Sequence, residues 1–151
     1  MVELFNFLLH IDHNVIIFMR MITEKRKTGN LGEDIACRFL IKKGFSIVER
    51  NYLKRFGEID IIAKYNSILH FIEVKSVSCE ISQNVSHETG GYRPEDNIHP
   101  WKMARLSRVI QTYLVDRHVS PETEWQFDVI TVYIDKNKLI SKVNFLENII
   151  L

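Results

Sequence analysis

Two short stretches decide the fold of this chain. Residues 57–63 read Gly-Glu-Ile-Asp-Ile-Ile-Ala, and residues 71–76 read Phe-Ile-Glu-Val-Lys-Ser. Both are rich in Ile and Val and carry charged residues at alternate positions, which is typical of β-strands. Asn66 and Ser67 lie between them, and Asn tolerates the left-handed conformation that a tight turn needs. We therefore predict an antiparallel hairpin with a two-residue turn at Asn66 and Ser67.

This register would gather four charged side chains on one face of the hairpin. It places Asp60 opposite Glu73, and Glu58 opposite Lys75. Charged groups in a buried strand are costly unless they are paired or bind a metal. Opposed carboxylates invite a cation, and oxygen ligands favour Mg²⁺ or Mn²⁺. Lys75 would hold a water or a phosphate oxygen beside that ion, so the hairpin predicts metal-assisted phosphodiester hydrolysis.

A ladder of salt bridges on a solvated sheet face would use the same charges. We favour the metal site because the order is Asp60, twelve intervening residues, and then Glu73-Val74-Lys75. This order resembles the signature of the PD-(D/E)xK nucleases. The residue before the acidic pair of Glu58 and Asp60 is Gly57, so the first letter of that signature, Pro, is absent.

A wider set of residues resembles the YraN family of endonuclease-like bacterial proteins. The match lies in residues 29–33 (Gly-Asn-Leu-Gly-Glu), 57–60 and 71–76, and extends more loosely over residues 28–147. One departure is Val77, where a second basic residue is usual in the family. The resemblance implies a fold like that of Holliday-junction resolvases and a DNA nuclease.

The resemblance also implies roles for individual residues. Asp60 and Glu73 would ligate Mg²⁺ or Mn²⁺ with the help of the Val74 carbonyl. Glu33 would lie at the start of the first helix and point at the metal. Glu33 also follows Asn30 by three residues, which is the spacing of a helix-capping box, so a purely structural role stays open.

The rest of the chain predicts an α/β fold, a mixed β-sheet with flanking helices on its two faces and the site at one sheet edge. The resemblance implies that this fold is of the restriction-endonuclease-like type. Apolar spacing, Gly44 and Pro100 mark the element ends. The expected order is a helix over 30–43, a strand over 45–52, the hairpin, a loop over 77–99 containing His87 and His99, a helix over 100–117, and strands over 125–134 and 139–145.

The second predicted helix carries Lys102, Arg105 and Arg108 at three-residue spacing. Such a stripe is usually a solvated face. Beside a phosphodiesterase site it becomes a candidate ridge for binding the nucleic-acid backbone. Asp128, on the next strand, is expected to form a strand-end salt bridge in preference to joining the site.

The N-terminal residues differ in character from the remainder. Residues 1–22 are apolar, but His10–Asn14 interrupt the run, so neither a membrane span nor stable membrane association is expected. They are either the product of a wrongly chosen start codon or a genuine extra helix. Residues 23–151 are expected to form one nuclease-like domain.

Composition is ordinary for a globular protein, with 46% apolar residues, 26% charged residues and a net charge of +1. Two cysteines without a CxxC motif predict reduced thiols and a cytoplasmic protein.

Three functional hypotheses follow. The leading one is a metal-dependent DNA endonuclease, acting on branched or damaged DNA and forming a homodimer. The second is a non-catalytic nucleic-acid-binding or adaptor protein that keeps the nuclease fold. The third is a membrane-associated or partner-docked scaffold that acts through residues 1–22.

Overall fold

The computed structural model describes residues 13–81 and 100–151, which form two helices and five strands. The predicted order of elements is confirmed. In chain order they are α2 (His13–Lys42), β1 (Ser46–Lys54), β2 (Gly57–Tyr65), β3 (Ile68–Ser78), α3 (Pro100–Asp116), β4 (Trp125–Asp135) and β5 (Ile140–Leu146). The expected loop begins later than predicted because Val77 and Ser78 belong to β3. His87 and His99 lie outside the described residues.

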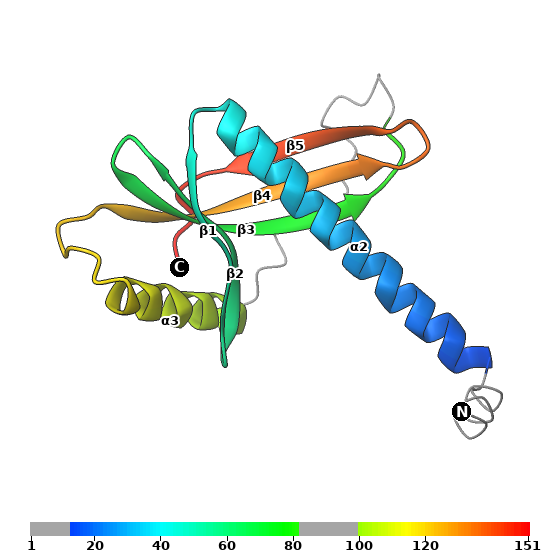
Figure 1. The fold of residues 1–151 in the computed structure, drawn as a ribbon, viewed down its shortest axis with the longest axis horizontal. Coiled ribbons are helices and arrows are strands. Elements are labelled where there is room, and N and C mark those ends of the chain that lie inside the picture. Colours follow the sequence, from blue (N-terminus) through cyan, green and yellow to red (C-terminus); the bar gives the residue numbers. More distant parts are fainter. Residues whose placement is uncertain (1–12, 82–99) are drawn as a thin grey trace, which may run out of the picture.

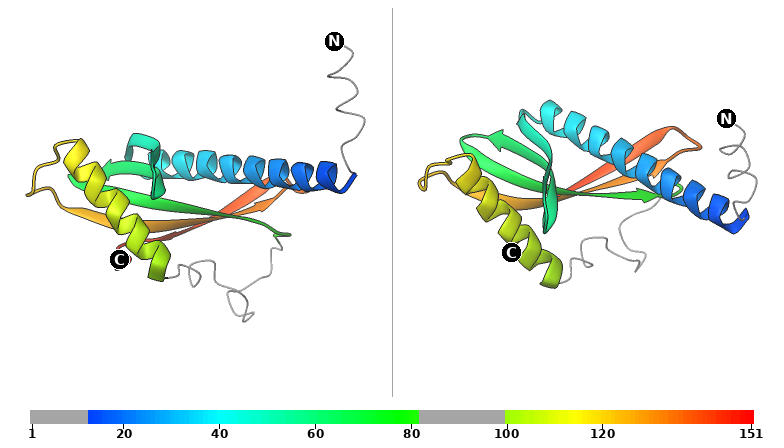
Figure 2. Two further views of the ribbon diagram at one scale, coloured as in Figure 1. Left: turned by 90° about the horizontal axis from the view of Figure 1, so that it is seen from below. Right: turned by 60° about the horizontal axis from the view of Figure 1, so that its bottom comes forward.

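The strands form one mixed sheet in the order β1-β2-β3-β4-β5, as the α/β prediction requires. β3 and β4 run parallel, and every other neighbouring pair is antiparallel. A parallel pair needs a crossover connection, and the segment that contains α3 supplies it. The two helices cover opposite faces of the sheet (Figures 1 and 2). The predicted site is therefore not at a sheet edge, because β2 and β3 are the second and third strands.

The hairpin turn has the predicted geometry. Asn66 and Ser67 both have positive φ, 48° and 77°, as expected for a two-residue turn that matches the strand twist. The ladder runs from Tyr65↔Ile68 to Ile61↔Ile72 in the predicted register and ends there. Asp60 and Glu73 therefore lie immediately beyond the last pair of β2 and β3.

The expected pairing of Glu58 with Lys75 is wrong. Glu58 is exposed and pairs with Leu53 of β1 instead. β1 and β2 remain paired as far as Gly57, where β2 is no longer paired with β3. The end of β1 and β2 that contains their connecting turn bends toward α3 (Figure 1). The sheet is thus open between β2 and β3 where the two carboxylates stand.

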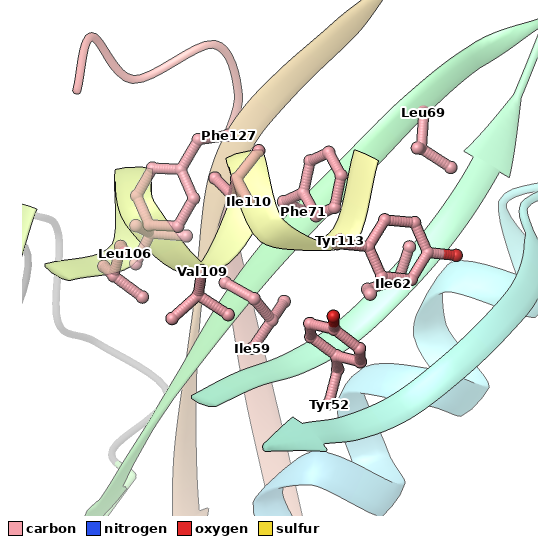
Figure 3. Close-up of a cluster of buried hydrophobic side chains, with 11 residues drawn as sticks. Tyr52, Ile59, Ile62, Leu69, Phe71, Leu106, Val109, Ile110, Tyr113 and Phe127 are labelled. Atoms are coloured by element: carbon pink, nitrogen blue, oxygen red, sulfur yellow. The ribbon is translucent and has the colours of Figure 1, made fainter. Parts of the chain in front are cut away.

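α3 packs on one face of the sheet through a buried apolar cluster (Figure 3). Its helix residues are Leu106, Val109, Ile110 and Tyr113, and its main sheet residues are Tyr52, Ile59, Ile62, Leu69, Phe71, Phe127 and Val129. Burial of apolar surface stabilises by about 25 cal/mol per Å². This contact therefore fixes the position of α3 relative to β2 and β3.

α2 packs on the other face through Ala36, Cys37 and Leu40. Leu31, on the same helix, is 44% exposed and lies outside this contact. The helix ends as predicted: Gly44 has φ 93°, the Phe45 N–H donates to the Leu40 carbonyl (3.0 Å), and the Gly44 N–H donates to the Ile41 carbonyl (3.0 Å). These bonds form a Schellman cap.

The predicted start of this helix at residue 30 is wrong, because α2 begins at His13. Asn30 is an interior helix residue, so the capping-box interpretation of Asn30 and Glu33 is also wrong. No Pro lies between residues 13 and 42, so no proline breaks the helix over this range. The proposed boundary between residues 22 and 23 falls inside this continuous helix. Within the described ranges, no helix is both long and apolar enough to cross a bilayer.

Candidate active site

Glu73 lies at the opening between β2 and β3 and accepts hydrogen bonds from two lysines. It lies on β3, and only 7% of the residue is exposed. Lys75 Nζ donates to Glu73 Oε1 at 3.0 Å, and Lys102 Nζ from α3 donates to the same oxygen. Alternation along the strand puts Glu73 and Lys75 on one face, so their contact follows from local geometry. The contact with Lys102 depends on how α3 packs.

Asp60 faces this group from β2. Its Oδ2 accepts a hydrogen bond of 2.7 Å from the Val74 N–H. Burial raises the pKa of the Asp60 carboxyl to about 7, and the negative charge of Glu73 adds to this effect, while the Val74 N–H opposes it. Among residues 13–81 and 100–151, no Lys or Arg forms an ion pair with Asp60. Asp60 is therefore a desolvated carboxylate that makes no direct ion pair with a Lys or Arg of those residues.

Glu33 reaches the site because α2 crosses β3 at very close range. A Cβ placed on Gly32 would lie 1.8 Å from Ser76 Oγ, so only glycine allows this approach. Glu33 lies 3.7 Å from Arg50 Nη2, measured to its Oε2. Burial raises the pKa of Glu33, although Arg50 lowers it in part. Because its charge also raises the pKa of Asp60, Glu33 belongs to the same electrostatic cluster.

Lys75 keeps its charge in this setting. Burial opposes the charged form, but the charge of Glu73, the hydrogen bond to it and the charge of Asp60 raise the pKa of the Lys75 ammonium. A cation held beside two carboxylates can orient a water molecule or a phosphate oxygen. The structure thus brings Asp60, Glu73 and Lys75 together, as the sequence predicts.

Gly57 lies at the entry into β2, close against α3. A Cβ at this position would lie 3.0 Å from Val109 Cγ2 of α3, which is tighter than ordinary packing. A side chain there would require Val109 to shift by a few tenths of an ångström.

Lys102 is a site residue that sequence reasoning placed elsewhere. The spacing rule grouped it with Arg105 and Arg108, yet it contacts Glu73. Arg105 Nε donates to the Phe56 carbonyl at 2.6 Å, and the Arg108 guanidinium lies over the Phe56 ring at 5.7 Å. Both arginines remain exposed beside the β1–β2 turn. The three cations therefore do not form one uniform ridge.

Asp128 does not join this site. Its Oδ2 lies 2.6 Å from His70 Nδ1, and its Oδ1 accepts from Gln126 Nε2 (2.7 Å) and the Asn148 N–H (2.9 Å). Asp128 and His70 are both buried. The expectation of an ion pair in place of a metal ligand is consistent with this geometry.

The chemistry of the donors fits a hard divalent cation with few protein ligands. Asp60 and Glu73 offer desolvated carboxylate oxygens and Val74 a carbonyl, while Mg²⁺ commonly keeps several waters. In the described parts of the chain, no three acidic, His or Cys side chains lie close enough together to hold a metal. Metal ligation would therefore rest on the two strand carboxylates, with Glu33 acting through water.

Comparison with known proteins places this arrangement in a family. Residues 32–132 match the Uncharacterised protein family UPF0102. The chain belongs to the UPF0102 family. This family is the YraN family, so the resemblance drawn from the sequence is confirmed. The matched residues run from Gly32, at the helix–strand contact, through the hairpin and α3 to β4.

Curated UPF0102 proteins resemble this chain over most of their length. One from Campylobacter lari is 40% identical over 117 residues, covering 78% of this chain and 93% of the relative. One from Campylobacter hominis is 42% identical over 123 residues, covering 82% and 93%. The family name prints no activity, so function has to be argued from the site.

Proposed function

We propose that this UPF0102 protein is a metal-dependent DNA endonuclease. One observation carries the proposal: β2 leaves β3 beside Asp60 and Glu73, with Lys75 in contact with Glu73. Two carboxylates and a lysine at the mouth of a sheet opening are the groups that metal-assisted phosphodiester hydrolysis needs.

Each residue has a defined part in this chemistry. Asp60, Glu73 and the Val74 carbonyl would hold Mg²⁺ or Mn²⁺, and Glu33 would hold an ion-bound water. The ion would polarise the phosphate and lower the pKa of an attacking water. Lys75 would orient that water. The oxygen of that water would bond to phosphorus as the water gives up a proton to solvent, one ester P–O bond would break, and the leaving oxygen would take up a proton from solvent.

Calorimetric titration with Mn²⁺ at pH 8 tests the metal site. The wild-type protein is expected to bind the ion, and Asp60→Asn is expected to lose binding because a neutral amide replaces a ligand charge. Glu122→Gln is the control, since this exposed carboxylate lies beside Lys64 and Ser67 at the turn end of the hairpin. Equal affinity of the wild-type protein and Asp60→Asn would remove the site.

A second candidate is a non-catalytic nucleic-acid-binding or adaptor protein. The observation in its favour is that both lysines at the site bond to Glu73, a purely structural use of a buried carboxylate. This reading predicts DNA binding that does not depend on divalent cations and no cleavage with any ion.

A further inference from the structure

Glu73 has two ammonium partners where the chemistry needs one. Lys75 is fixed beside it by the strand, two residues along, whereas Lys102 comes from the first turn of α3. Both bond to the same oxygen, Oε1. The second lysine therefore needs an explanation of its own.

Helix stability does not supply that explanation. Positive side chains near a helix N-terminus are disfavoured by the helix dipole, and α3 has no acidic residue in its first turn. Lys102 is also not needed to fill the core, since its side chain is 29% exposed. What holds the ammonium in place is the Glu73 carboxylate.

The charges of the four central groups explain what this contact does. With both carboxylates ionised, Asp60 and Glu73 contribute two negative charges, and Lys75 and Lys102 contribute two positive charges. The group is then neutral, so it attracts a dication weakly. Without Lys102 it would carry one net negative charge in a partly buried setting, where charge interactions are stronger than in water.

We propose that Lys102 is a positioning residue that occupies Glu73 in the metal-free protein and competes with the divalent cation for that carboxylate. Ligation of the ion by Glu73 displaces the Lys102 ammonium, whose flexible four-carbon stem lets it move aside. Lys102 thereby sets the metal affinity of the site. This inference rests on the proposed function.

Mn²⁺ calorimetry without DNA tests the competition. Lys102→Met and Lys102→Gln are expected to bind Mn²⁺ about tenfold or more tightly than the wild-type protein, because a competing charge is gone. Lys102→Arg keeps the charge and should bind within about twofold of wild type on the same argument. Lys142→Met, at an exposed position on β5, is the control for loss of any lysine and should not differ from wild type.

The outcomes separate this inference from the proposed function. Tighter binding in both neutral variants, with wild-type affinity in Lys102→Arg, supports the competition. A purely structural lysine would give weaker binding in all three variants, which would overturn it. If the wild-type protein binds Mn²⁺ and the neutral variants bind no more tightly, only the role of Lys102 fails. If neither the wild-type protein nor the neutral variants bind Mn²⁺, the metal site fails, and the proposed function with it.

Discussion

Burial of the Asp60 carboxyl lowers the free energy of unfolding by an amount that depends on pH. Its pKa is about 7 when folded, against an ordinary 3.8. As pH rises from about 4 to 7, the unfolded chain ionises this carboxyl while the folded protein keeps the proton. The free energy of unfolding therefore falls across this window, and the full cost is present above pH 7. Buried carboxylates kept at such a cost are typical of functional sites.

Asp60→Asn should therefore stabilise the metal-free protein at high pH. Asn keeps an oxygen that accepts the Val74 N–H but carries no charge. We expect a gain of about 1–3 kcal/mol in the free energy of unfolding at pH 8, and a smaller gain at pH 5. Thermal or urea unfolding at both pH values measures this, with exposed Glu122→Gln as the control. A gain that does not depend on pH would contradict the burial of a charged Asp60.

Gly32 shows how one residue sets the distance between two elements. α2 approaches β3 so closely that a side chain at this position would overlap Ser76. The same contact places Glu33, the next residue, near the carboxylates. Gly29 lies one turn earlier in the same helix, and a Cβ there would meet nothing within 4 Å. The two glycines therefore offer a matched pair.

Gly32→Ala is expected to destabilise the protein by about 1–3 kcal/mol through overpacking. Gly29→Ala should stabilise it by up to about 1 kcal/mol, because Ala favours the helix interior. Denaturant unfolding of both variants measures the difference. The double variant Gly32→Ala with Ser76→Gly should recover part of the loss. Equal stability of the two single variants would show that α2 does not touch β3 at this point.

α3 carries two exposed arginines beside the β1–β2 turn. If Arg105 and Arg108 contact phosphates, replacing both with Gln should weaken binding to every sequence alike. Each lost contact should flatten the slope of log K against log salt by about 0.9 on duplex DNA. Fluorescence anisotropy over a salt series measures the slope.

The control for this pair lies on the opposite side of the sheet. Lys42 and Lys43, at the exposed C-terminal end of α2, should leave the slope unchanged when both are replaced by Gln. An unchanged slope in the arginine variant would mean that these side chains only line the turn.

At the scale of the whole molecule, local patterns were predictable and non-local contacts were not. The register of the hairpin follows from the turn at Asn66 and Ser67, and Gly44 marks a helix end. The parallel pairing of β3 with β4 and the contact of Lys102 with Glu73 join residues far apart in sequence. Spacing within one helix carries no information about them. The early start of α2 was missed because Asn30 and Glu33 have the spacing of a helix-capping box, although no Pro interrupts residues 13–42.

A homodimer remains a whole-molecule prediction. An enzyme that cuts both strands commonly presents two sites related by a two-fold axis. Tyr113 of α3 is buried in the core, whereas Met21 and Ile22 on α2 are exposed. Light scattering with and without DNA should give twice the mass of one chain. A monomer under both conditions would count against this prediction.

Cleavage assays on branched, nicked, single-stranded and duplex DNA test the central claim most directly. The wild-type protein should cut at least one of these substrates with Mg²⁺ or Mn²⁺ and none with a chelator. Lys75→Ala should bind the same substrate with little loss of affinity and fail to cut it, because Lys75 acts on the reacting water. If the wild-type protein cuts none of them with either ion, or Lys75→Ala cuts at the wild-type rate, the assignment of these residues to phosphodiester hydrolysis is wrong.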